Sequence, residues 1–310
     1  MTNLSASQLL ELQLARFRKR RPMRAGSLII TLYGDTISQH GNSAWLGSVI
    51  NALQPFGLSQ RLVRTAVYRL IQDNWLSSEQ VGRRSYYSLT EFGLRHYQKA
   101  ARRIYAAEHS QASGEWLFVY LSSLPDRERE QLRKELRWLG FGNLFPAVMA
   151  KPGAERRSLD ETLRELGLHE QVMILRSQPD DLTSEQHLRK LVYECWNLSE
   201  LEQQYRSVWE VFQPIYQRLK QGDLLSPEQA FQLRTLLIHE YRRLLLKDVE
   251  LPSSLLPASW IGTDVQNLAA NLYRKVHSLA EQFVVNELET VSGALPPASK
   301  DYFTRFGGLS

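Results

Sequence analysis

The spacing of apolar residues predicts a small group of helices followed by a hairpin in the first third of the chain. Apolar side chains recur three and four residues apart, which is typical of one face of a helix, until Trp75. After Trp75 the period changes to two, as in half-buried strands. The predicted elements are helices opening at Ser27, Ser43 and Ser59, strands at 75–80 and 85–89, and a helix opening at Thr90. This order is typical of a winged helix-turn-helix.

In the remainder of the chain, the same pattern predicts a short segment of alternating strands and helices, followed by helices alone. Strands at 116–121, 144–149 and 172–175 alternate with helices at 126–139 and 159–167, and no fourth strand is evident. This alternation favours a small α+β domain of ferredoxin-like type. Four further helices are expected at 184–196, 199–220, 227–247 and 264–288.

The fold class expected is therefore mainly α with α+β parts. The predicted organisation is a basic N-terminal arm (1–25), a winged helix-turn-helix DNA-binding domain (26–110), a ferredoxin-like central domain (111–180) and a helical C-terminal effector or dimerisation domain (181–310).

Composition narrows the class of protein. The chain has 310 residues, 43% of them hydrophobic and 23% charged, which are ordinary globular values. Its longest apolar runs are about six residues, against roughly 20 for a membrane-spanning helix. The N-terminus has no apolar signal region, and the single cysteine, Cys195, allows no internal disulfide. We therefore expect a soluble cytoplasmic protein without membrane contact.

The charge is unevenly distributed. The formal net charge is +5, but residues 1–110 carry 15 Lys or Arg against six Asp or Glu. A positive first third indicates contact with a polyanion. The basic run 16–22 has two interpretations, a solvated mobile arm or an arm that tracks DNA.

The helix at 59–74 has the composition of a DNA recognition helix. One face carries a broad apolar stripe for packing, and the opposite face carries Arg61, Arg64, Thr65 and Tyr68. Arginine can bond guanine O6 and N7 together, and threonine can contact a thymine methyl group. The alternative for the helix alone is an ordinary solvated basic face.

A basic hairpin after that helix favours DNA binding over the solvated face. Arg83 and Arg84 lie at its tip, where a wing meets the DNA backbone or minor groove. We expect Arg61, Arg64 and Thr65 to contact bases or nearby phosphates. The residues expected mainly to position the backbone are Ser59, Gln60, Arg69, Arg83, Arg84 and Tyr86, with Tyr68 on the same surface.

No catalytic or metal-binding motif emerges. None of the seven histidines has partners at metal-ligand spacing, and Cys195 lies in a helical pattern typical of a core residue. His239-Glu240 begins like a zinc protease motif, but Arg243 stands where the second histidine belongs. We expect no catalytic residue, no metal and no cofactor.

A second cluster of cations follows His239. His239, Arg243 and Lys247 are spaced four apart on one predicted helix, with Arg242 beside them and Trp260 beyond a proline-rich turn. These five residues are a candidate site for an anionic ligand with an aromatic part. The alternative is a solvated helix face with extended arginines.

Several motifs, in order along the chain, resemble the PaaX family. They are SAWLGS (43–48), FGLSQRLVRTA (56–66), GRRSYYSL (82–89), ECWNL (194–198), HEYRRLLLKD (239–248), LLPASW (255–260) and YFTRFGGL (302–309). Members of that family repress operons for phenylacetic acid degradation.

The resemblance implies a dimeric repressor that binds double-stranded operator DNA and is released by phenylacetyl-CoA, an effector and not a cofactor. It also implies a central domain similar to a nuclease subunit of the CRISPR integration complex. Those nucleases have a metal-binding aspartate at the end of the first strand. Here Leu121, Ser122 and Ser123 stand there and Asp126 comes too late, which argues against nuclease activity. The competing hypotheses are an effector-independent DNA-binding protein and a nuclease-like enzyme with a winged-helix appendage.

Overall fold

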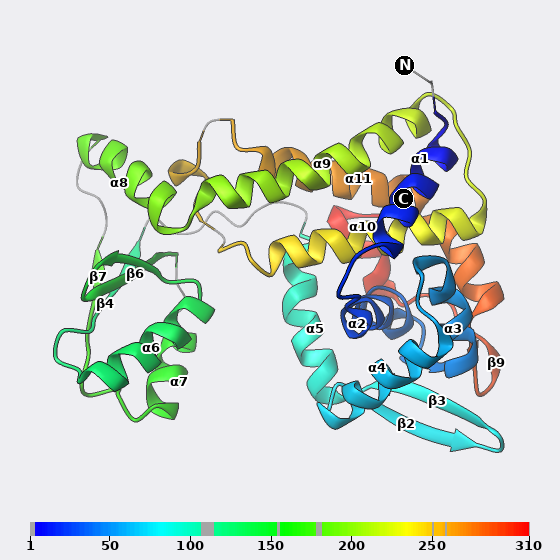
Figure 1. The fold of residues 1–310 in the computed structure, drawn as a ribbon, viewed down its shortest axis with the longest axis horizontal. Helices are drawn as coiled ribbons and strands as arrows, with labels where there is room; N and C mark the ends of the chain where they lie inside the picture. The colour runs from blue at the N-terminus through cyan, green and yellow to red at the C-terminus, as the bar shows by residue number, and fades with distance from the viewer. Residues whose placement is uncertain are drawn as a thin grey trace. The chain divides into compact units, whose positions relative to one another are not determined.

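The computed structural model describes residues 4–106, 115–153, 156–177, 182–249, 251–257 and 259–309 (Figure 1). They form two compact units, each built from separated stretches of chain. Unit 1 combines Met1–Glu108, Tyr205–Leu246 and Thr263–Ser310, and unit 2 combines His109–Gln204 and Lys247–Gly262. The two segments predicted as separate domains, 26–110 and 181–310, thus lie largely in the same unit, unit 1. Part of the segment 181–310 belongs to unit 2.

Much of the expected basic N-terminal arm (1–25) is a helix of unit 1, and the basic run 16–22 covers the end of this helix and the residues after it. Helix α1 (Ala6–Arg18) begins with a capping box in which Ser5 and Gln8 bond each other's backbone N–H groups. Its side chains Leu10, Leu14 and Phe17 are buried. The basic run hid this apolar stripe, because the charges fall at the end of the helix and beyond it.

A three-helix group and the predicted two-stranded hairpin follow, and a third strand that was not predicted joins the hairpin. The helices are α2 (Ala25–Asp35), α3 (Leu46–Leu53) and α4 (Gln60–Gln72). Strands β2 (Leu76–Val81) and β3 (Arg84–Leu89) form the hairpin, and α5 (Glu91–Ile104) begins after the N-cap Thr90. One prediction was wrong: Ser43–Trp45 does not open the second helix but forms strand β1, paired with β3.

The C-terminal helices of unit 1 pack around this group. They are the second part of α9 (Leu198–Lys220), the buried helix α10 (Pro227–Leu245) and most of α11 (Ile261–Glu287). A small hairpin, β8 (Glu289–Thr290) with β9 (Gly293–Ala294), follows α11. The chain then closes on unit 1 through the 3-10 segment η4 (Lys300–Gly307), which the sequence pattern had left unassigned.

Unit 2 contains a four-stranded antiparallel sheet covered by two helices. Along the chain the elements are β4 (Trp116–Tyr120), α6 (Asp126–Trp138), β5 (Gly142–Phe145), β6 (Val148–Pro152), α7 (Arg156–Glu165) and β7 (Met173–Ser177). The strand order β5-β6-β4-β7 confirms the ferredoxin-like prediction. The predicted strand at 144–149 is in fact two strands joined at a tight turn, which supply the missing fourth strand.

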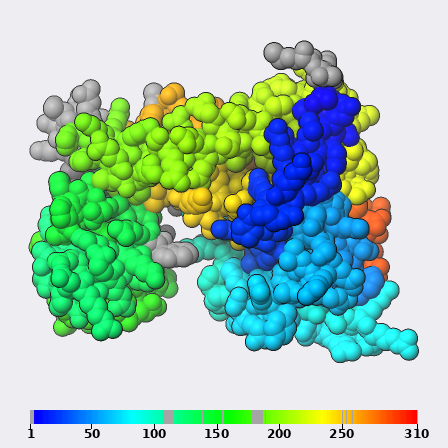
Figure 2. All heavy atoms as spheres, viewed as in Figure 1, coloured from blue at the N-terminus to red at the C-terminus, as the bar shows by residue number. Residues whose placement is uncertain are grey.

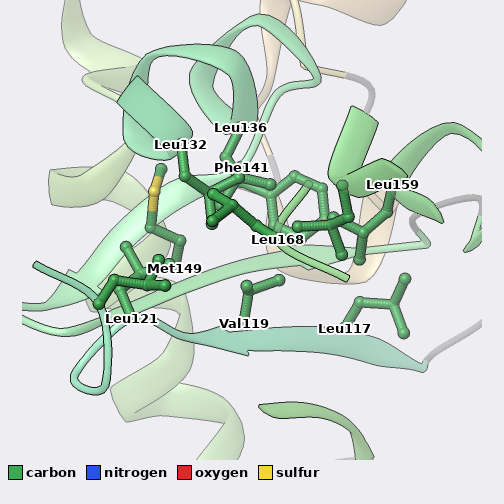
Figure 3. Close-up of a cluster of buried hydrophobic side chains, with 11 residues drawn as sticks. Leu117, Val119, Leu121, Leu132, Leu136, Phe141, Met149, Leu159 and Leu168 are labelled. Atoms are coloured by element: carbon green, nitrogen blue, oxygen red, sulfur yellow. The ribbon is translucent and has the colours of Figure 1, made fainter. Parts of the chain in front are cut away.

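The core of unit 2 lies between the sheet and its helices (Figure 3). Leu117 and Val119 of β4, and Leu121 directly after it, alternate along the chain and point to one face. Leu132 and Leu136 of α6 pack on them, with further leucines from α7. Helix α8 (Leu182–Cys195) follows the sheet. No helix among the described ranges has the length and apolarity needed to cross a membrane.

Candidate nucleic-acid interface

Helix α4 separates into a packing face and a solvent face, as its sequence predicts. Ser59 caps the helix: its Oγ accepts the Leu62 N–H at 3.3 Å. Val63, Ala66, Val67 and Leu70 are buried against the rest of unit 1. The packing of this stripe fixes the rotation of the helix, so the opposite face is held outward.

The outward face is basic and accessible. Arg61, Arg64, Thr65 and Arg69 are exposed, and Tyr68 is 64% exposed. The Thr65 hydroxyl donates to the Arg61 carbonyl oxygen at 2.9 Å. None of the three arginines forms an ion pair with a carboxylate of the described chain. Their hydrogen-bond donors are therefore available to phosphates or to base edges.

The wing ends in a two-residue loop, Gly82-Arg83. Val81 pairs with Arg84 across the hairpin, and Gly82 takes φ +61°, as the first central residue of a type II′ turn requires. Arg83 is exposed at this tip and has no ion-pair partner among the described residues. Ser59, Gln60 and Arg83 thus lie on the surface, as the sequence predicted.

Two predicted wing contacts need correction. Tyr86 is only 5% exposed and faces the inside of the wing, where it lies opposite Trp45, so its side chain does not point to solvent. Arg84 is exposed but already engaged. Its guanidinium lies 4.1 Å from the centre of the Trp45 ring and 2.5 Å from the Glu289 carboxylate, and the hydrogen bond to Glu289 raises the pKa of Arg84. The sequence could not place Glu289 beside the wing, because 205 residues separate the two partners.

The five candidate effector residues are not gathered on one exposed face. His239 is 2% exposed, with Nδ1 3.2 Å from the Thr31 hydroxyl. Burial, and then the neighbouring cations of Arg243, Arg242 and Arg20, lower the pKa of His239 to about 3, so it is neutral at pH 7.

The other four candidates divide between the two units. Arg242 is 8% exposed, and its Nη1 lies 3.4 Å from the Ser27 carbonyl oxygen. Arg243 is half-buried, 3.4 Å from Glu240. Lys247 and Trp260 belong to unit 2, where Lys247 Nζ donates to Gln204 at 3.1 Å.

A buried ionic network that the sequence pattern did not predict is centred on Asp35, at the end of α2. The Asp35 side chain is 1% exposed and accepts hydrogen bonds from Tyr105 (2.5 Å), Tyr273 (3.0 Å) and Arg305 Nη1 (3.0 Å). Arg234, which is fully buried, lies 3.3 Å from the same carboxylate. These partners come from the C-cap of α5 and from α10, α11 and η4, so the network joins the winged helix to the C-terminal elements of unit 1. Two features of the sequence could have indicated this network: Asp35 ends an apolar helix, and Arg234 lies within another helix that is rich in apolar residues.

A second carboxylate completes this network. Glu281 of α11 lies 2.5 Å from Arg234 and 2.9 Å from His40 Nε2. The His40 Nδ1 donates to the Pro296 carbonyl oxygen at 2.7 Å. Although burial opposes ionisation, Arg234 and His40 lower the pKa of Glu281 to about 2.

The described residues offer neither a cluster of metal ligands nor an activated thiol. They include no group of three or more His, Cys, Asp or Glu that could hold a metal. Burial raises the pKa of the Cys195 thiol, which is opposite to the shift that activates a nucleophile. After β4, Leu121 is buried, Ser123 donates to the Gln171 carbonyl oxygen, and Asp126 pairs with Arg129 on α6.

An outward basic recognition helix followed by a wing defines a winged helix-turn-helix protein of the nucleic-acid-binding class. Family models match most of the chain: PaaX-like protein at residues 24–93, PaaX protein central Cas2-like domain at 109–189 and PaaX-like protein C-terminal domain at 196–286. The chain belongs to the PaaX-like family. It is 40% identical over 290 residues to the Transcriptional repressor PaaX of Escherichia coli strain K12, covering 93% of this chain and 92% of the relative.

A solved structure shares the fold. The uncharacterized protein Rv0674 from Mycobacterium tuberculosis superimposes with a TM-score of 0.53 at 19% sequence identity, over 82% of this chain and 98% of that one. At this identity the likeness concerns the fold alone.

Proposed function

We propose that this protein is a transcriptional repressor that binds operator DNA of phenylacetate-degradation genes through its winged helix and is released by phenylacetyl-CoA. The observation that carries DNA binding is the exposed face of α4, where Arg61, Arg64 and Arg69 have no carboxylate partner in the described chain. The E. coli relative, named a transcriptional repressor, supports the regulatory role, and the family resemblance supports the effector.

The residues divide by the part of DNA that each can reach. Arg61, Arg64 and Thr65 occupy one face and would meet base edges in the major groove. Ser59 and Gln60, at the helix start, and Arg83, at the wing tip, would contact phosphates, as would Arg69 and Tyr68 at the edge of that face. This division predicts sequence specificity from the helix and general affinity from its surroundings.

A homodimer would read a two-fold site. Two recognition helices related by a two-fold axis contact half-sites about 34–36 Å apart, or a multiple of that distance, on a near-palindromic operator. A cytoplasmic, non-enzymatic regulator fits this function. Release requires that phenylacetyl-CoA bind more tightly to a state with lower DNA affinity.

The test is fluorescence anisotropy on promoter DNA from a phenylacetate operon, with random DNA as competitor. Phenylacetyl-CoA, free phenylacetate and coenzyme A are each titrated into the complex. Release by the thioester alone supports the whole proposal. Specific binding that none of the three changes would refute the effector and leave an effector-independent repressor, and failure to prefer promoter DNA would refute the repressor function.

The effector candidates can be tested in the same assay. Arg243→Ala and Lys247→Ala remove the two cations of the set that reach solvent, while His239→Gln alters a buried neutral group. If coenzyme A phosphates bind either of these two side chains, its variant needs more phenylacetyl-CoA for half-release, with unchanged DNA affinity. An unchanged half-release concentration would assign the effector to other residues.

A further inference from the structure

We propose that the basic linker between α1 and α2, residues 19–24, is a second DNA-contacting element, which binds the phosphate backbone beside the base pairs that α4 reads. This inference rests on the proposed DNA binding and adds a site to it. The basic linker carries Lys19, Arg20, Arg21 and Arg24, all exposed. These residues belong neither to the recognition helix nor to the wing.

Contacts at both ends hold the basic linker against the recognition-helix region. Before it, the Arg18 guanidinium donates to the Pro55 carbonyl oxygen at 2.7 Å, a few residues before α4 begins. The Phe17 and Phe56 rings meet edge to face, with centroids 6.2 Å apart. After it, Gly26 lies close to Leu70, near the end of α4. Figure 2 shows the dark-blue N-terminal segment lying along the lighter-blue residues of the winged helix.

The dimensions allow the basic linker to run beside α4 for much of its length. Six residues span at most about 20 Å when extended, and a 13-residue helix is also about 20 Å long. A helix 10–12 Å across fills a major groove that is about 12 Å wide. Side chains placed just beside a helix in the groove therefore face the phosphates of the groove wall. Bases are out of their reach, so the contact would carry affinity and no sequence preference.

The cations differ in how far they are already neutralised. Arg20 lies 2.5 Å from the Glu240 carboxylate and stacks over Phe17 at 5.1 Å. Arg21 donates to two backbone carbonyl oxygens, which leaves its charge uncompensated. Lys19 and Arg24 have no ion-pair partner in the part of the chain that is described. Three of the four charges are thus available to a polyanion.

The start of α2 adds to the positive potential. Its N-cap, Arg24, makes no side-chain cap, and the Ala25 and Gly26 N–H groups have no acceptor within the described ranges. Beneath this turn lies Arg242, which is more than nine-tenths buried. Its Nη1 is 3.4 Å from Ser27, and its Nε has no hydrogen-bond partner in the described residues. Free amides and an unbalanced buried cation beside exposed arginines favour an anion at this place.

The experiment measures the salt dependence of DNA binding. The variant Lys19→Gln/Arg21→Gln/Arg24→Gln is compared with the wild type on promoter and random duplexes of equal length, from about 50 to about 200 mM salt. We expect similar losses on both duplexes and a slope of log K against log salt that is shallower by about 0.9 per lost contact, or about 2.7 in total. Arg20→Gln should change the slope less, because Glu240 already balances that charge.

A matched control distinguishes the loss of phosphate contacts by the basic linker from the lower net charge of the protein. Arg127→Gln/Lys134→Gln/Arg137→Gln removes three exposed charges from α6 of unit 2 and should leave the slope near the wild-type value. Equal slopes for the linker variant and this control would overturn the proposal. If the wild type binds neither duplex, the proposed function itself fails. The single variants Lys19→Gln and Arg24→Gln, each expected to lower the slope by about 0.9, keep the test decisive if the triple variant folds poorly.

Discussion

Replacement of Asp35 by asparagine tests whether the buried network holds unit 1 together. The change keeps the shape of the side chain and removes its charge. Asp35 accepts from Arg305, Tyr105 and Tyr273 and lies 3.3 Å from Arg234 Nε. Without the carboxylate, the buried guanidiniums of Arg234 and Arg305 lose their shared anion, and among the described residues Glu281 pairs with Arg234 and His40 but not with Arg305. An uncompensated buried charge of this kind costs about 3–5 kcal/mol.

The assay is thermal and urea unfolding followed by far-UV circular dichroism. For a unit of this size, 1 kcal/mol shifts the Tm by about 2–4 °C, so Asp35→Asn should lower the Tm of unit 1 by about 6–20 °C. The control is Asp301→Asn, an exposed aspartate of η4, expected to change stability by less than about 0.5 kcal/mol. A loss below about 1 kcal/mol for Asp35→Asn would refute the idea that its charge balances the two arginines.

A double variant sharpens this prediction. If Arg305→Met is added to Asp35→Asn, one unbalanced cation disappears, and part of the lost stability should return. The double-mutant cycle should give a coupling of about 1–3 kcal/mol. Strictly additive losses would mean that the 3.0 Å contact between these side chains contributes little to folding.

Three further predictions concern binding and pH. Arg64→Ala should cost about 1–3 kcal/mol on operator DNA and relax specificity at one base pair, measured by anisotropy on base-substituted duplexes; equal weakening on every sequence would indicate a phosphate contact. Glu289→Gln should free Arg84 for a phosphate and steepen the salt slope by about 0.9, whereas Glu287→Gln, an exposed neighbour, should not. The pKa values of about 3 for His239 and about 2 for Glu281 both lie below those of the unfolded chain, so the unfolded chain binds more protons and stability should fall on acidification. The His239 contribution to stability is lost from about pH 6.5 downward, and the Glu281 contribution from about pH 5 to 2. Between about pH 6.5 and 5 the urea midpoint of His239→Gln should therefore fall less than that of the wild type. An equal fall would contradict the contribution of His239.

Local sequence determined the elements and the faces of the winged helix. The apolar stripe of α4, its Ser59 cap and the change to period two after Trp75 are short-range features, so helix, cap and hairpin could be predicted from neighbours alone. The same stripe oriented Arg61 and Arg64 toward solvent. The Ser43–Trp45 strand could not be predicted, because three residues become a strand only by pairing with β3, more than 40 residues later.

Tertiary structure decided which charges remain available for binding. Arg84 and Arg83 are equivalent in the sequence, yet Glu289 from the far end of the chain neutralises only Arg84. His239 and Arg242 were candidates for a ligand site, but the fold buries both. Asp35 and Arg305 are 270 residues apart and meet inside the core. A buried or paired charge depends on partners brought together by the fold. Periodicity therefore predicts the face on which a residue lies, and only the folded chain decides what that residue meets there.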